Sequence, residues 1–271
     1  MNTEEIMHLS LKLAGLKEVP EDTAIYVSGK NISKVLFGID ASAPEILLAK
    51  QLGYDAVIAH HPIGGTAAIN FYQVFKRHIQ QMISAGVPKD EAEKAASKKL
   101  EQLEVEAHTR NYDHAVNVAR LLKMPYMNIH TPLDEVGRRI MSEKINSRTG
   151  KNSTVKDVVS ALMELPEFKN ATTEIKIRLG KAENSAGKIV VSHGAGTNGG
   201  YEIAETYFKH GIGTVIYIHI NAGDLAKLKA DGVGNLIVTG HIASDSVGIN
   251  PFIHELEKRN IFVAKIGVVP S

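Results

Sequence analysis

A short apolar run, a helix and a second short apolar run follow one another twice along this chain. In the first half, the apolar run 34–39 is followed by a predicted helix over 43–52 and by the apolar run 56–59. This alternation is typical of the strand–helix–strand unit that builds a parallel or mixed sheet. The chain is therefore expected to adopt an α/β fold.

The second half repeats the pattern. It contains predicted strands over 188–192, 214–218 and 235–239, with a helix over about 201–210. We therefore predict two related α/β halves with mixed sheets, residues 1–141 and 154–271, which indicates a duplication. Several of these strands end in polar residues, and ligands of open α/β sheets bind beyond the carboxyl ends of the strands.

The segment 72–123, within the first half, is predicted to be wholly helical, with a charged and solvated face. This helical insertion can be a surface hairpin, or a lid that limits which substrates reach a site. Residues 142–153 are polar and rich in turn formers, which predicts a linker between the halves. Residues 4–16 carry leucine and isoleucine at helical spacing and predict an amphipathic helix.

Composition excludes several classes of protein. The 271 residues include 31 basic and 30 acidic side chains, and no basic stripe suggests a nucleic-acid partner. No apolar run approaches the ~18 residues of a membrane span, and the N-terminus has no apolar signal core, so we expect a cytoplasmic protein. The chain has no cysteine, so any metal ion must be held by His, Asp or Glu.

The first candidate site is His60-His61-Pro62, directly after the run 56–59. Pro62 favours extended backbone at His61, and neighbours on a regular strand point to opposite faces. The two imidazoles can therefore share a site only if the chain turns here, or else each serves a different metal ion. Histidine is the commonest metal ligand, so the pair predicts a metal site at the end of this strand.

The second candidate is the segment His130-Thr131-Pro132-Leu133-Asp134, after a short predicted strand over 126–129. An imidazole and a carboxylate here could bind a metal ion. The structural alternative is an ordinary turn before a helix that has an aspartate near its N-terminus.

The third candidate is the pair His241 and Asp245, which follows the predicted strand 235–239. If Ser244 caps the next helix, the two side chains lie one turn apart and can bind one ion. The alternative is a capping aspartate with an incidental histidine. Imidazole nitrogen combined with carboxylate oxygen suits Zn, Mn, Fe or Ni.

The three motifs in this order on an α/β chain resemble the NIF-three-like family of dinuclear metal proteins, some of which are named GTP cyclohydrolase I type 2. The resemblance extends from Asp40 to the C-terminus and includes the glycine-rich loop 193–200 between a strand and a helix. It implies two α/β domains facing each other across a metal cleft, often in a toroidal hexamer. It also implies two divalent ions per chain, with the ligands His60, His61, Asp134, His241 and Asp245.

The resemblance further implies that His130 orients the Asp134 turn or contacts substrate, and that Asp40 lies behind the ligands. The sequence departs from the family pattern at Asp245, where glutamate is usual, and at Pro132, where asparagine is usual. The insertion 72–123 is also longer than the family pattern. These departures bear on the substrate more than on the fold.

The glycine-rich loop 193–200 has two interpretations. A loop of small residues before a helix N-terminus offers amides to a phosphate group, although it matches neither the dinucleotide-binding nor the P-loop pattern. Alternatively, its glycines serve a tight turn with positive φ.

For function, the residues favour a dinuclear metal-dependent hydrolase acting on a nucleotide or phosphorylated substrate, GTP cyclohydrolase-like by resemblance. His130, or a nearby histidine such as His193 or His219, would act as general acid or base. The first alternative is a non-catalytic metal-binding regulatory or scaffold protein. The second is a nucleotide-binding protein without metal.

Overall fold

The computed structural model describes the whole chain, residues 1–271. It consists of two compact units, each drawn from several stretches of sequence. Unit 1 comprises Met1–Val74, Leu103–Val136 and Gly248–Val268, and unit 2 comprises Phe75–Gln102, Gly137–Val247 and Val269–Ser271. These units differ in extent from the halves 1–141 and 154–271 expected from the sequence, because the C-terminal strand joins the first sheet and part of the helical insertion joins unit 2.

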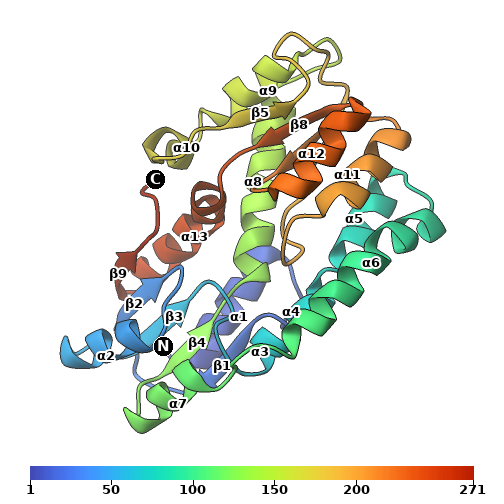
Figure 1. Cartoon of the computed structure of the whole chain (residues 1–271). Helices are drawn as coiled ribbons and strands as arrows, with labels where there is room; N and C mark the ends of the chain where they lie inside the picture. The colour runs from blue at the N-terminus through green and yellow to red at the C-terminus, as the bar shows by residue number, and fades with distance from the viewer. The chain divides into compact units, whose positions relative to one another are not determined.

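Unit 1 contains a five-stranded sheet with the order β1-β4-β3-β2-β9 (Figure 1). The strands are β1 (Ala24–Val27), β2 (Lys34–Gly38), β3 (Ala56–Ala59), β4 (Tyr126–Asn128) and β9 (Phe262–Ile266). Only β1 is antiparallel to its neighbour. The helices wholly within this unit are α1 (Thr3–Ala14), α2 (Ala43–Gln51), α3 (Gly65–Ile69), α4 (Phe71–Val74) and α7 (His114–Leu121).

Unit 2 contains a four-stranded sheet with the order β5-β8-β7-β6. The strands are β5 (Lys176–Leu179), β6 (Lys188–Val191), β7 (Ile212–Tyr217) and β8 (Asn235–Val238). The helices wholly within this unit are α5 (Arg77–Ala85), α9 (Val155–Leu162), α10 (Pro166–Asn170), α11 (Gly200–Lys209) and α12 (Ala222–Asp231). Three more helices, α6 (Lys89–Ala107), α8 (Thr131–Arg148) and α13 (His241–Glu257), contribute residues to both units.

The two sheets share one topology. In each, the first strand in chain order is antiparallel to the fourth, and the fourth, third and second strands are parallel neighbours. Both antiparallel pairs have an irregularity at the same place, between Ile25 and Val27 in β1 and between Ile177 and Leu179 in β5. The two sheets therefore resemble each other in strand order, strand direction and the position of the irregularity, as expected for two related α/β parts. The prediction of mixed sheets is confirmed.

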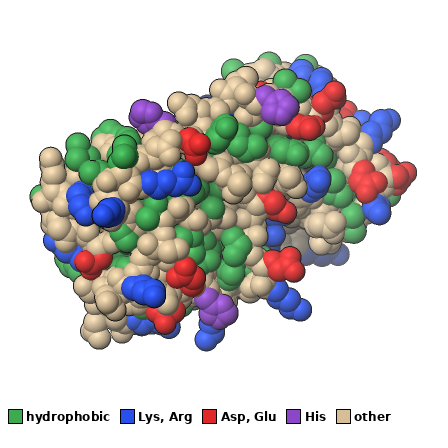
Figure 2. Space-filling model, turned by 90° about the horizontal axis from the view of Figure 1, so that it is seen from below, with side chains coloured by type: hydrophobic (Ala, Val, Ile, Leu, Met, Phe, Trp, Pro, Cys, Tyr) green, Lys and Arg blue, Asp and Glu red, His purple; other side chains and the backbone are tan.

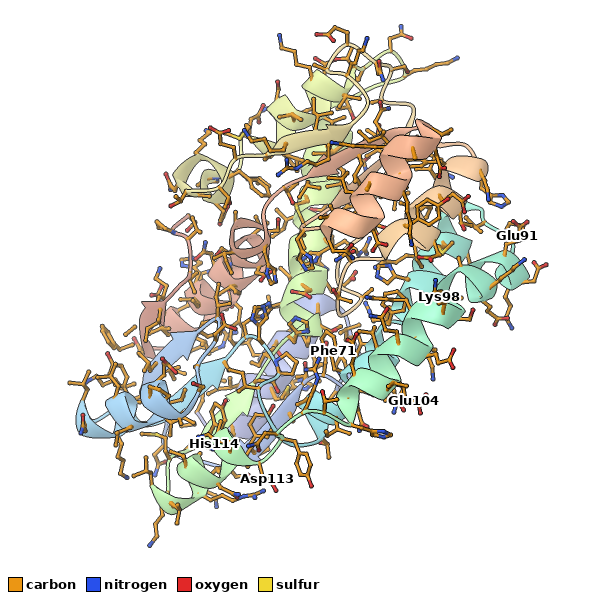
Figure 3. All side chains as sticks on the ribbon, in the orientation of Figure 1. Phe71, Glu91, Lys98, Glu104, Asp113 and His114 are labelled. Atoms are coloured by element: carbon orange, nitrogen blue, oxygen red, sulfur yellow. The ribbon has the colours of Figure 1, made fainter.

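The helices predicted over 72–123 are present, and one of them belongs to the repeat. In unit 2, α12 connects β7 to β8 and packs beside α11, whereas in unit 1 α7 packs beside α2 before the chain enters β4 (Figure 1). Helix α7 therefore corresponds to α12, and α3 to α6 are the additional segment. Two ion pairs join α6 to α11. Glu91 of α6 lies 2.9 Å from His210, which directly follows α11, and Lys98 of α6 lies 3.8 Å from Glu202 of α11 (Figure 3).

The linker predicted over 142–153 is wrong in its first half, because α8 continues to Arg148. Met141 and Ile145 are fully buried one helical turn apart in the core of unit 2. Burial of large apolar side chains stabilises by about 1.5–3 kcal/mol each, which outweighs the weak helix preference of the polar residues around them. The turn itself follows at 149–153, and Thr154 then caps α9.

Each unit has its own apolar core. In unit 1, β3 is buried along its whole length, as expected for a parallel strand covered on both faces. Tyr126 lies in the same core, and its hydroxyl donates to the carbonyl of Ala41 at 2.8 Å. That hydrogen bond offsets the cost of burying the phenol.

One face of the molecule exposes charged side chains of both signs (Figure 2). On the face shown in Figure 2, basic and acidic side chains are interspersed, with no large patch of one sign. None of the helices combines the length and the hydropathy required to cross a bilayer.

Candidate metal centre

Three histidines of unit 1 lie together beyond the ends of two parallel strands. The chain bends at His60 and His61 directly after β3, and His130 follows β4, the neighbouring parallel strand. The ligand nitrogens of His60, His61 and His130 all lie within 4.8 Å of one another. The bend explains how adjacent residues can contribute to one cluster, which a regular strand would not allow.

Each of these imidazoles is held through Nδ1. Nδ1 of His60 lies 3.0 Å from the carbonyl oxygen of Ile129, and Nδ1 of His61 lies 2.7 Å from Oδ1 of Asp40. Nδ1 of His130 lies 2.7 Å from Oδ2 of Asp22. All three acceptors are oxygens, so a neutral ring donates from Nδ1 and presents the lone pair of Nε2 to a ligand, which is the arrangement found in metal-ligating histidines.

Asp134 adds a carboxylate to this cluster from the first turn of α8. Its Oδ1 lies 3.2 Å from Nε2 of His60, and its Oδ2 lies 3.6 Å from Nε2 of His130. Helix α8 begins at Thr131, and Pro132 is its second residue. Proline is favoured in the first turn of a helix because the backbone N–H groups there have no partner within the helix. The cluster therefore offers imidazole and carboxylate donors that could hold a metal ion.

The sequence did not point to Asp22, although the structure buries it completely beside this cluster. Its Oδ2 accepts hydrogen bonds from His130 Nδ1 and from the Thr131 hydroxyl, both at 2.7 Å. Asn128 donates from its side chain to the backbone carbonyl of Asp22 at 2.7 Å. Asp22 thus fixes the orientation of an imidazole more than 100 residues away in the sequence.

In unit 2, His241 is the first residue of α13 and Asp245 lies one turn further along, with His241 Nε2 3.3 Å from Asp245 Oδ2. Ser244, considered above as a possible cap, does not cap this helix, because α13 already begins at His241. The Ser244 hydroxyl instead bonds within the first turn, to the carbonyl of Gly240 at 2.6 Å. The spacing of one turn between His241 and Asp245 is nevertheless present.

His219 lies beside this pair. Its ring centroid is 4.8 Å from that of His241, and Asn198 of the glycine-rich loop donates to its Nδ1 at 3.0 Å. The same asparagine accepts from the amide of Gly200, at the start of α11. The loop 193–200 is therefore linked to the histidines of unit 2 through one side chain.

Helix α5 holds the glycine-rich loop by its carbonyls. Arg77 Nε donates to the carbonyl of Gly194 at 2.7 Å, and Gln81 Nε2 donates to that of His193 at 2.6 Å. The part of the predicted insertion that carries α5 is thus hydrogen-bonded to the glycine-rich loop.

His78 is the third contact of α5 with this region. Its Nε2 donates to the carbonyl of Thr197 at 2.8 Å, and its Nδ1 accepts from the Ser192 hydroxyl at 3.2 Å. Burial lowers the pKa of His78 to about 4. The imidazole is therefore neutral at physiological pH, as these two hydrogen bonds require.

The family model of DUF34/NIF3 (NGG1p interacting factor 3) matches residues 24–269. The chain belongs to the DUF34/NIF3 family. This confirms the resemblance that the three motifs indicated, and it covers both units.

Solved structures agree with this assignment. The chain is 47% identical to a NIF3 superfamily protein from Sphaerobacter thermophilus, over 99% of each chain and with a TM-score of 0.97. HcgD from Methanocaldococcus jannaschii, in its reduced form, matches with 13% identity and a TM-score of 0.58 over 98% of this chain and 97% of its own. A Bacillus cereus protein related to NIF3 matches with 11% identity and a TM-score of 0.54 over 100% and 97%. The last two share the fold, and no protein of curated function matches the sequence.

Proposed function

We propose that this NIF3-family protein is a dinuclear metal-dependent hydrolase. Its proposed metal ligands are those that the family resemblance implies: His60, His61, Asp134, His241 and Asp245. The observation that carries the proposal is the convergence of three imidazoles in unit 1, each held through Nδ1 by an oxygen. The His241–Asp245 pair offers one imidazole nitrogen and one carboxylate oxygen, one helical turn apart.

When bound, a pair of divalent ions supplies a water molecule of lowered pKa and polarises the bond that it attacks. His130 is the proposed proton carrier, since its ring is oriented by the buried carboxylate of Asp22. Asp40 holds a second imidazole, that of His61, in the same way. The proposed substrate is a nucleotide or another phosphorylated molecule, because the loop 193–200 precedes the N-terminus of α11, where backbone amides favour a phosphate group.

Metal content tests the site. Elemental mass spectrometry is expected to find about two ions per chain in the wild type. His61→Ala and Asp245→Ala are expected to lose one ion or both, whereas His8→Ala, which changes an exposed histidine of α1, should keep both. Folded wild-type protein that stays metal-free after reconstitution would refute the proposal.

Hydrolysis of GTP and of a chromogenic phosphoester by the metal-loaded protein tests the activity. His130→Ala should keep its metal and lose about 10²-fold or more in rate, as removal of a general acid or base does. Loss of metal from His130→Ala would instead make His130 a ligand.

The alternative function is a non-catalytic metal-binding regulatory or scaffold protein. It is favoured by the contacts of α5 with the glycine-rich loop, since carbonyls of that loop are engaged by Arg77 and Gln81. A metal-loaded protein without hydrolytic activity would support this alternative. The family resemblance also leads us to propose a homo-oligomer, a hexamer, which sedimentation analysis of the metal-loaded protein would test.

A further inference from the structure

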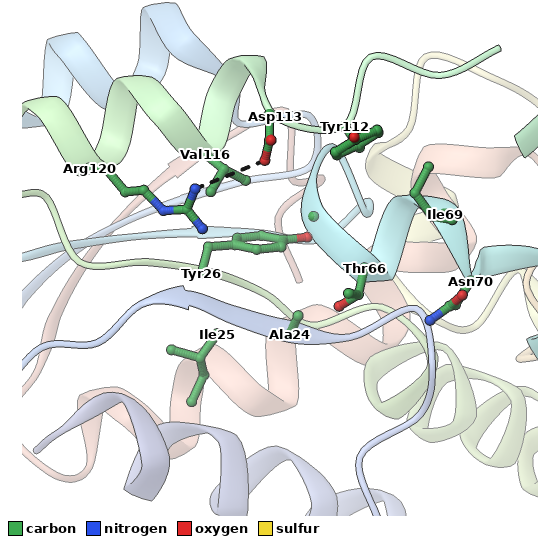
Figure 4. Close-up of a pocket in the computed structure, with 11 residues that line it drawn as sticks. Ala24, Ile25, Tyr26, Thr66, Ile69, Asn70, Tyr112, Asp113, Val116 and Arg120 are labelled. Carbon is green, nitrogen blue, oxygen red and sulfur yellow. Dashed lines mark ion pairs between the residues drawn. The ribbon is translucent and has the colours of Figure 1, made fainter. Parts of the chain in front are cut away.

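Unit 1 contains a cavity of about 360 Å³ that includes none of the histidines of the metal cluster. It lies between the edge strand β1 and the helices α3 and α7 (Figure 4). Its walls are mostly apolar, with Ile25 and Tyr26 from β1, Ile69 from α3 and Val116 from α7. Its volume matches a small organic molecule.

Two glycines directly after His-His-Pro shape one wall. A Cβ on Gly65 would approach the ring of Tyr26 to 2.9 Å, and one on Gly64 would approach Val116 to 2.6 Å. The amide of Gly65 also donates to the carbonyl of Tyr112 at 2.6 Å. Only glycine allows α3 to start this close to β1 and α7, so the cavity is closely defined by its surroundings.

The ring of Tyr26 is fixed by its neighbours. The hydroxyl of Tyr26 donates to Oδ1 of Asn128 at 2.7 Å, and the Tyr26 ring packs on Tyr126 with centroids 5.0 Å apart. Burial raises the pKa of Tyr26, so the phenol remains a donor in this bond. A ligand can therefore pack against the face of a fixed aromatic ring.

One end of the cavity carries two opposite charges. Arg120 and Asp113 lie beside each other there, with 4.0 Å between guanidinium nitrogen and carboxylate oxygen, and both are about half exposed (Figure 4). Asp113 occupies the N-cap position of α7, yet its side chain makes no capping hydrogen bond. An ion pair this long and this exposed contributes little free energy. Arg120 and Asp113 can therefore give up their contact with each other and bind a ligand instead at little cost in free energy.

From these features we infer that the cavity binds a free amino acid with an aromatic or large aliphatic side chain. Its carboxylate meets Arg120 and its ammonium meets Asp113, while the side chain lies on Tyr26, Ile69 and Val116. A phosphate ligand fits less well, because Arg120 is the single cation of the lining and the Asp113 carboxylate beside it repels a dianion. This inference is independent of the metal site.

Isothermal titration calorimetry with L-phenylalanine tests the inference. Phenylacetate keeps the ring and the anion, and 2-phenylethylamine keeps the ring and the cation. L-phenylalanine should bind the wild type, and both analogues should bind at least about tenfold more weakly because each lacks one charged contact. This comparison needs no variant and therefore does not depend on the folding of one.

Variants locate the site. Arg120→Gln and Asp113→Asn should each weaken binding of L-phenylalanine by about tenfold or more. Arg139→Gln, which changes an exposed arginine of α8 outside the cavity, should bind like the wild type. The inference is overturned if the wild type does not bind L-phenylalanine at concentrations up to ~10 mM, if the three compounds bind equally, or if Arg120→Gln binds as the wild type does.

Discussion

Asp22 and His130 are joined by a hydrogen bond of 2.7 Å between Oδ2 and Nδ1, and both side chains are buried. A carboxylate behind a metal-ligating or proton-carrying imidazole fixes its tautomer and raises its basicity. His130 is the proposed proton carrier, so Asp22→Asn should keep its metal and lower the hydrolysis rate by about tenfold or more, because the amide cannot replace the charged acceptor. Hydrolysis of the chromogenic phosphoester by the metal-loaded variant measures this rate.

Asp55→Asn is the matched control for Asp22→Asn. Asp55 also accepts several hydrogen bonds in unit 1, from the backbone amides of Ser33 and Lys34 and from the Ser33 hydroxyl. Asp55→Asn should lose stability without a change in the hydrolysis rate of the metal-loaded protein. Equal hydrolysis rates of Asp22→Asn and the wild type would show that Asp22 has only a structural role.

Asp40 offers a graded comparison. It binds His61 Nδ1 at the same distance of 2.7 Å, but its side chain is 72% exposed, whereas that of Asp22 is fully buried. Asp40 holds the proposed ligand His61, but water competes for an exposed carboxylate, so Asp40→Asn should lower metal affinity only a few-fold. Competition with a coloured chelator measures this affinity, and a loss of about 100-fold would contradict the argument from exposure.

The interior strands could be predicted from the sequence, whereas three edge strands could not. Strand β3 is a continuous apolar run, which is the signal of a strand buried on both faces. Strands β1, β5 and β9 lie at sheet edges, and β5 alternates exposed charged residues with less exposed apolar ones. Their place depends on partners far along the chain, as in the pairing of Ala24 with Asn128, and no local pattern contains that information.

The candidate site shows the same division. His60, His61, His130 and Asp134 were predictable because they follow strands whose carboxyl ends meet at one edge of the sheet. Asp22 was not, because it lies in a turn before β1 and acts through a contact 108 residues along the chain. A lone aspartate in a turn looks like any other turn residue.

Removing a contact between α5 and the glycine-rich loop should lower the stability of the protein. Arg77→Ala removes a charged donor from the Gly194 carbonyl and should lower the free energy of unfolding by about 1–3 kcal/mol. Amide hydrogen exchange in 193–200 should also become faster, because the loop loses one of its anchors. Lys89→Ala is the control, since its ion pair with Glu93 is exposed and worth at most about 0.5 kcal/mol. Unchanged exchange in the loop of Arg77→Ala would rule out the anchoring role.

His78 predicts a loss of stability on mild acidification. Its pKa falls from the ordinary value of 6.5 to about 4 in the folded protein, because the ring is buried. The unfolded chain therefore binds a proton between these values that the folded chain does not. By linkage, the contribution of His78 to stability is fully present above pH 6.5 and is lost as the pH falls toward 4, with an upper limit of about 3 kcal/mol.

Urea unfolding at pH 7 and at pH 4.5 measures this contribution. His78→Gln should be less stable than the wild type at pH 7, and its stability should change less between the two pH values, because glutamine can form hydrogen bonds but does not titrate. His8→Gln should keep the wild-type pH dependence, since His8 is exposed and no buried imidazole is removed. If His78→Gln loses as much stability as the wild type between pH 7 and 4.5, the acid sensitivity comes from other groups, and the neutral His78 between Ser192 and Thr197 is not its source.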